Sequence, residues 1–189
     1  MKPFVLAAAL ALAATTASAA EKYVLDASHS QVLFEYDHLG YSTTTGMFSG
    51  FEGEIMFDAD APANSTVAVS MPVSSMFTGW EKREAHFLSG DFFNAEENDL
   101  VTFTSTGIEV TGDNTALITG DLTMNNVTKS VVLDAVLNKS GEHPMAKQPW
   151  LGFNATTTVT RSDFALGAFA PAVSDDVAIR ISLEAMKAQ

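Results

Sequence analysis

The chain has 189 residues, with 23 acidic against 10 basic residues, a formal net charge of −13 and no cysteine. This excess of negative charge repels nucleic acid and disfavours anionic membrane surfaces, because no cluster of Lys and Arg offsets it. The lack of cysteine excludes disulfides, thiolate metal ligands and a cysteine nucleophile.

The first 20 residues have the layout of a secretory signal. Lys2 precedes an apolar run over residues 4–14, and a stretch of small residues ends at Ala19-Ala20. The apolar run is too short to span a membrane, and no later segment reaches the ~18 apolar residues that a spanning helix needs. We expect cleavage after Ala19 or Ala20. The Ala-rich signal and the missing disulfides favour export to a bacterial periplasm, with residues 21–189 as one domain.

The exported part alternates apolar and polar residues in eight stretches, which predicts strands with one wet and one buried face. Gly46, Gly50 and Gly53 suggest a bend within the second stretch, and a break near residues 26–28 interrupts the first. The expected strands cover residues 23–38, 43–58, 67–73, 100–110, 115–124, 128–137, 151–161 and 177–186.

One segment between the strands has a different period. Residues 80–88 lack β-branched side chains and place Trp80, Glu84 and Phe87 at helical spacing. Thr78 is a plausible helix cap, and Ser89-Gly90 ends the segment. We expect a short helix that lies across one end of the sheet.

Eight antiparallel strands are expected to close into a barrel, since closure removes both exposed edges. A barrel of this size is either filled by side chains or holds one small ligand. The strand pattern leaves both alternatives open, because its apolar phase carries large and small residues. The large ones include Phe34, Phe51, Phe57, Phe103 and Phe153, and the small ones Gly53, Gly120 and Ala155.

The sequence gives little support for catalysis. No pair of the four histidines, His29, His38, His86 and His143, has the helical spacing of a zinc site. No Gly-x-Ser-x-Gly elbow and no phosphate-binding glycine loop is present. We therefore expect no catalytic residue, metal or cofactor, and interpret His29 and His38 as hydrogen-bonded wall or turn residues. A hydrolase that uses a histidine remains a third alternative.

Two arginines are conspicuous in so acidic a chain. Arg83 lies on the expected helix and Arg161 at the end of a strand. Either side chain is able to neutralise an anionic head group at the mouth of a cavity. The competing interpretation is an ion pair, of Arg83 with Glu84 or Asp91 and of Arg161 with Asp163 or Asp175.

A series of short motifs in a fixed order covers the whole exported part. Together they resemble the YceI-like family of exported lipid-binding proteins. The motifs are Tyr23-Val24-Leu25-Asp26 with His29-Ser30, Phe34, His38 and Gly40, Gly46-x-Phe48, Phe51-x-Gly53-x-Ile55-x-Phe57-Asp58, Arg83-Glu84-Ala85-His86-Phe87-Leu88, Asp91-Phe92-Phe93, Phe103-x-Ser105, Gly120-Asp121-Leu122-Thr123, Val127-Thr128-Lys129, Arg161-Ser162-Asp163-Phe164 and Asp175-Asp176-Val177. Glu84 departs from the family pattern, in which an aspartate is usual.

The resemblance implies a lipocalin-like antiparallel barrel with a short helix across one end. It also implies a non-catalytic carrier that holds a polyisoprenoid or a fatty-acid derivative inside the barrel. A solid-cored accessory domain that meets another periplasmic protein is the alternative, and a homodimer stays open. We expect the apolar chain among Phe34, Phe48, Phe51, Phe103 and Phe153, and the head group near His38, Arg83, His86 or Arg161.

Overall fold

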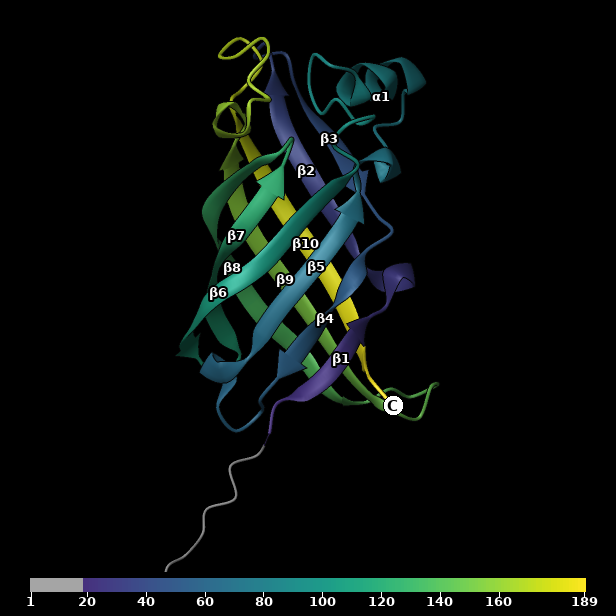
Figure 1. The fold of residues 1–189 in the computed structure, drawn as a ribbon, viewed down its shortest axis with the longest axis vertical. Helices are drawn as coiled ribbons and strands as arrows, with labels where there is room; N and C mark the ends of the chain where they lie inside the picture. The colour runs from purple at the N-terminus through teal and green to yellow at the C-terminus, as the bar shows by residue number, and fades with distance from the viewer. Residues whose placement is uncertain (1–18) are drawn as a thin grey trace, which may run out of the picture.

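The computed structural model describes residues 19–189. Residues 1–18 of the expected signal peptide lie outside the described residues, so its cleavage stays a prediction. The helix α1 spans Glu81–Leu88 (Figure 1). The strands are β1 (Glu21–Leu25), β2 (Gln31–His38), β3 (Ser42–Phe48), β4 (Glu52–Phe57), β5 (Thr66–Pro72), β6 (Leu100–Gly112), β7 (Thr115–Met124), β8 (Val127–Glu142), β9 (Pro149–Thr160) and β10 (Asp176–Lys187).

These strands form one closed antiparallel sheet. β1, β4, β5, β6, β7, β8, β9 and β10 pair in that order, and the pairing of β10 with β1 closes the ring. β2 continues the line of β1 along β10, and β3 pairs with β2. β1 and β2 together take one position in the barrel, and β3 and β4 take another. The ten segments therefore make an eight-stranded barrel, which confirms the predicted fold class.

The breaks between segments follow from local chemistry. The Asp26 side chain accepts a hydrogen bond from the Ser28 backbone N–H at 3.0 Å and begins a short 3₁₀ turn that separates β1 from β2. Asn125 and Asn126 adopt left-handed backbone angles, φ 50° and 57°, as a tight hairpin between β7 and β8 requires. Gly50, with φ 68°, lies in the bend between β3 and β4.

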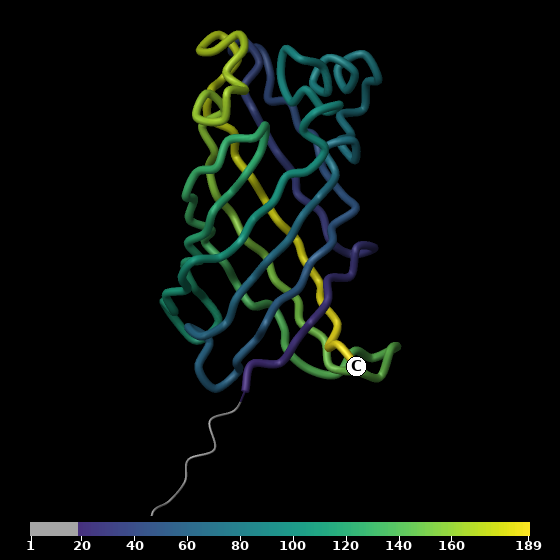
Figure 2. The backbone as a smooth tube through the Cα atoms, viewed as in Figure 1, coloured from purple at the N-terminus to yellow at the C-terminus, as the bar shows by residue number. Residues whose placement is uncertain are grey.

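The two ends of the barrel are built differently (Figures 1 and 2). One end, called here the α1 end, carries residues 39–41, the segment 73–99 with α1, the turn 125–126 and the connection 161–175. The opposite end carries the start of β1, the C-terminus and the connections 58–65, 113–114 and 143–148. The predicted helix therefore does lie at one end of the sheet.

Two details differ from the sequence expectations. β8 runs on to Glu142, because the polar residues after Leu137 still pair with β9 through their backbones, as in Ser140 with Leu151. Thr78 does not cap α1. Its backbone N–H and hydroxyl donate to the Glu84 carboxylate at 2.7 and 3.3 Å, and Trp80 occupies the N-cap position without a capping side chain.

No helix among residues 19–189 is both long and apolar enough to cross a bilayer.

Candidate functional site: an apolar cavity inside the barrel

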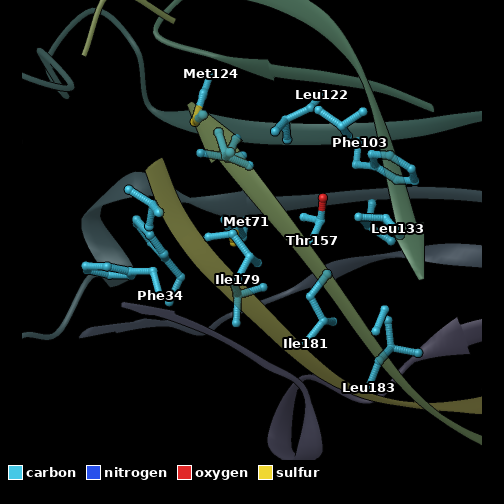
Figure 3. Close-up of a pocket in the computed structure, with 18 of the residues that line it drawn as sticks. Phe34, Met71, Phe103, Leu122, Met124, Leu133, Thr157, Ile179, Ile181 and Leu183 are labelled. Carbon is cyan, nitrogen blue, oxygen red and sulfur yellow. The ribbon is translucent and has the colours of Figure 1, made fainter. Parts of the chain in front are cut away.

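A cavity of about 1050 Å³ occupies the interior of the barrel. Side chains from β2 to β10 line it, and most of them are apolar. Figure 3 shows part of this wall, where Ile179, Ile181 and Leu183 of β10 face Leu133 of β8, with the hydroxyl of Thr157 among them. Alternate residues of each strand point inward, so the same pattern that predicted the strands produces the apolar lining.

The interior stays open partly because two phenylalanine rings lie against the wall. Gly46 of β3 is paired with Phe34 of β2, and a Cβ at Gly46 would lie closer than 3.0 Å to three atoms of the Phe34 ring. Gly120 of β7 receives the Phe103 ring of β6 in the same way. Each ring covers a glycine of the neighbouring strand, which keeps it off the barrel axis.

This arrangement corrects one step of the sequence reasoning. Gly53 and Gly120 were expected to leave free space among larger residues. A Cβ at Gly53 would instead meet the Ala68 carbonyl oxygen and the Val69 Cα, so that glycine permits close approach of two strands. At Gly120 the space is taken by Phe103. Of the three small residues, Ala155 lines the cavity.

All five phenylalanines that we expected around an apolar chain line the cavity. The side chains of Phe34, Phe48, Phe51, Phe103 and Phe153 belong to its wall. Phe34 and Phe48 pack with ring centroids 5.5 Å apart, and Phe57 adds an edge contact to Phe153 at 6.4 Å. An interior this hollow argues against the solid-cored alternative.

An aromatic cluster closes part of the α1 end. Phe92 contacts His86 and Phe87, each with centroids 5.1 Å apart, and Phe169 lies 6.1 Å from His86 and 6.2 Å from Phe92. These rings come from α1, the segment after it and the connection 161–175. Sequence reasoning missed Phe169, because an irregular connection has no period that marks which residues turn inward.

The four head-group candidates also line the cavity, and they lie at the α1 end. They are His38, Arg83, His86 and Arg161, and Lys82 joins them. Asp113, at the opposite end, is the acidic residue of this lining within the described chain. In a protein with a net charge of −13, the charged side chains that line the cavity at the α1 end are thus basic.

The guanidinium of Arg161 is occupied by backbone carbonyls. It donates to the carbonyl oxygens of Ser174 at 2.9 Å, Leu166 at 2.5 Å, Ala168 at 3.2 Å and Val173 at 3.1 Å. Burial lowers the pKa of this guanidinium, although the Asp175 carboxylate nearby opposes the shift. Arg161 therefore holds the connection 161–175 together and has few donors left for a ligand.

Arg83 has a more open environment. Its guanidinium carbon lies 5.7 Å from the centroid of the Trp80 ring, and one nitrogen donates to the Thr78 carbonyl at 3.3 Å. None of the six ion pairs found among residues 19–189 includes Lys82 or Arg83. Asp91, an expected partner of Arg83, accepts instead from His86 at 3.0 Å.

His29 lies in the turn after β1, as expected, and is not part of the cavity lining. Its Nδ1 is 2.7 Å from Asp26 Oδ2 and 3.0 Å from the Ser28 hydroxyl, which donates to Asp26 Oδ1 at 2.6 Å. The hydrogen bond to Asp26 raises the pKa of His29. Burial acts to raise the pKa of Asp26, but hydrogen bonds from Ser28 and His29 outweigh it and lower that pKa.

A closed antiparallel barrel around a large, mostly apolar cavity defines this protein as a hollow β-barrel. A YceI-like domain matches residues 23–185, and a UPF0312 protein of Ectopseudomonas mendocina (strain ymp) is 38% identical over 174 residues, which cover 89% of this chain and 88% of the relative. A UPF0312 protein of Pseudomonas syringae pv. syringae (strain B728a) is 37% identical over 190 residues, 95% of this chain and 96% of the relative. The chain belongs to the YceI-like family.

Solved structures share the fold. The YCEI protein of Campylobacter jejuni matches with a TM-score of 0.73 and 27% identity, over 81% of this chain and 90% of that chain. BcnA of Burkholderia cenocepacia matches with a TM-score of 0.76 and 23% identity, over 85% and 98%. A polyisoprenoid binding domain from Saccharophagus degradans matches with a TM-score of 0.69 and 14% identity, over 88% and 98%. The last two show similarity of fold alone.

Proposed function

We propose that this protein is a non-catalytic carrier that encloses a long apolar chain, such as a polyisoprenoid or a fatty-acid derivative, inside its barrel. The cavity of about 1050 Å³ carries this proposal. At roughly 30 Å³ for each water-sized group, a cavity of that volume holds roughly 35 carbon-sized groups, or about seven isoprene units.

The energetics favour such a ligand. Burial of one methylene contributes about 0.8 kcal/mol, so one five-carbon isoprene unit contributes about 4 kcal/mol before the cost of ordering the chain. Several units together still give tight binding. A wall of aliphatic and aromatic side chains has little means to distinguish one apolar chain from another, so selectivity is expected at the head group.

Lumen-blocking variants test the carrier function. Ala155→Phe places a ring in the cavity, whereas Ala178→Phe places the same ring on the outer face of β10, where Ala178 is exposed. A fluorescent fatty-acid probe should bind the unmodified protein and Ala178→Phe, should be displaced by isoprenoid alcohols, and should fail to bind Ala155→Phe. Leu133→Phe serves as a second lumen variant if Ala155→Phe does not fold. An unmodified protein that binds no probe and carries no co-purifying lipid by native mass spectrometry refutes the proposal.

The basic residues at the α1 end support an anionic head group there. We expect a polyprenyl phosphate to displace the probe several-fold better than the corresponding alcohol, since the phosphate meets Lys82 and Arg83. The double variant Lys82→Gln/Arg83→Gln should bring the two ligands to similar affinity. Lys129→Gln, outside the cavity lining, should leave the preference unchanged. Equal affinity of phosphate and alcohol for the unmodified protein contradicts this assignment.

Export to the periplasm is part of the proposal and is supported by the layout of residues 1–20. The intact mass of the protein recovered from cells should begin at Ala20 or Glu21. A mass that includes Met1 contradicts it.

A further inference from the structure

Exposed aromatic side chains gather at the α1 end of the barrel. Tyr41, Trp80 and Phe169 are 88%, 56% and 62% exposed, and Leu39 is 49% exposed. Leu39 and Tyr41 come from the β2–β3 turn, Trp80 precedes α1, and Phe169 lies in the connection 161–175. We call these four residues the rim. A group of large apolar side chains exposed together at one site is typical of a surface that meets a protein or a membrane.

The rim continues into the cavity. Leu39, Trp80 and Phe169 line the cavity and are also about half exposed to solvent or more. The connections that carry them are joined, because the Leu39 backbone N–H donates to the Ala172 carbonyl at 3.1 Å and Phe169 packs on His86 of α1. An apolar path therefore leads from the outside of this end into the barrel.

The opposite end has another character. There the cavity reaches exposed Pro62 and Val110, neither of which is aromatic, and the polar turn of Gly112, Asp113 and Asn114. Aromatic rings with exposed cations beside them are typical of surfaces that sit at the level of lipid head groups. Near Trp80 of the rim lie the exposed Lys82, two residues further along the chain, and the half-buried Arg83, whose guanidinium carbon is 5.7 Å from the Trp80 ring centroid.

We propose that the rim docks on the surface of a phospholipid bilayer and places the cavity mouth against the membrane. This inference rests on the proposed carrier function, because a long apolar chain is hardly soluble in water and needs a dry route between bilayer and cavity. The net charge of −13 opposes attachment by charge alone, so insertion of the rim side chains supplies the attachment, and zwitterionic lipid suffices.

The two tryptophans of the chain report on opposite ends. Trp80 belongs to the rim, whereas Trp150 begins β9 at the opposite end, where it packs on His143 and donates to Glu184 at 2.8 Å. In Trp150→Phe the emission comes from Trp80, and in Trp80→Phe it comes from Trp150. With phosphatidylcholine vesicles, the protein should sediment with the lipid. The emission should shift to the blue in Trp150→Phe and stay unchanged in Trp80→Phe.

Rim variants complete the test. Tyr41→Ser and Phe169→Asn should each weaken vesicle binding about tenfold, the gain expected from burial of one aromatic side chain. Asn suits position 169 because Phe169 has a left-handed backbone, φ 64°. Met145→Ser is the matched control, since Met145 is 84% exposed at the opposite end.

Several results overturn the proposal. The proposal is wrong if the protein does not bind vesicles, if Met145→Ser weakens vesicle binding as much as Tyr41→Ser does, or if the emission of Trp150 shifts to the blue when vesicles are added. A blue shift of Trp80 that needs no vesicles and follows protein concentration assigns the rim to a second copy of the chain.

Membrane docking and the carrier function can be tested independently of each other. Ala155→Phe should still bind vesicles, whereas Tyr41→Ser, which lies outside the cavity lining, should still bind a soluble probe.

Discussion

Gly46 controls how much of the barrel interior is free. The Phe34 ring lies where a side chain of residue 46 would begin, and Gly46 itself is buried on the inner face of β3. In Gly46→Ala the new methyl group forces the ring to rotate about its side-chain bonds. The wall behind it is made of backbone, so the space open to the ring is the cavity. We expect Gly46→Ala to fold and to have a smaller lumen.

The size of the effect follows from the geometry. A six-carbon ring at roughly 30 Å³ for each carbon-sized group occupies roughly 180 Å³, about a sixth of the cavity volume of about 1050 Å³. This equals about one isoprene unit, whose burial contributes about 4 kcal/mol before ordering costs. Because those costs cancel much of the gain, we expect binding of a chain that fills the unmodified cavity to weaken between about 10-fold and 100-fold.

Probe displacement by isoprenoid alcohols of increasing length measures this effect. Affinity should rise with length in both proteins and level off about one unit earlier in Gly46→Ala. Adding Phe34→Ala to the variant should restore the original length. Gly152→Ala is the control, because nothing lies within 4 Å of a Cβ at that position. If a folded Gly46→Ala shows the same length dependence as Gly152→Ala, the wall-bound ring does not set the volume.

Arg161→Met should lower the free energy of unfolding by about 2–4 kcal/mol, because four carbonyls lose their donor. Thermal unfolding measures this loss. Arg161→Lys should recover little of the lost stability, because an ammonium cannot reproduce the planar fork of the guanidinium. Thr157→Val removes a hydroxyl from the lumen wall and should strengthen binding of a plain apolar chain several-fold, as measured by probe displacement. Because the pKa of His29 is raised in the folded protein, its contribution to stability is fully present below the ordinary His pKa of 6.5 and is lost as pH rises through the folded pKa. In an NMR titration, Asp26→Asn should lower the pKa of His29.

Period-two alternation was enough to predict the barrel. Each strand has one wet face, so its sequence pattern repeats every second residue, and the eight expected strands match the eight barrel positions. The break after Leu25 and the bend at Gly50 were also predictable, since an Asx turn and glycines mark them locally. The strand ends were less certain, as the extension of β8 to Glu142 shows, because backbone pairing continues through polar residues.

The period-two pattern could not predict whether the barrel is hollow. A phenylalanine on the apolar phase has the same spacing whether its ring points along the axis or lies on a neighbouring glycine. The choice depends on the strand register that places Gly46 opposite Phe34, a relation between two strands that neither sequence segment contains alone. Arg161 gives a similar lesson. At a strand end it was a candidate for ligand contact, but its donors serve a connection whose shape no periodicity predicts.

The distribution of charge is a consequence of the barrel itself. Charged residues on a strand belong to the wet face, so the many acidic residues lie outside, and a charge reaches the cavity mainly where strands end and connections begin. Among the residues that line the cavity, the charged side chains in these connections include Lys82, Arg83 and His86 at the α1 end and Asp113 at the opposite end. If the proposed carrier function holds, an anionic amphiphile is expected to bind with its head at the α1 end. The rim surrounds that same end, so a ligand held in this orientation presents its head to the membrane surface on which the rim is proposed to dock.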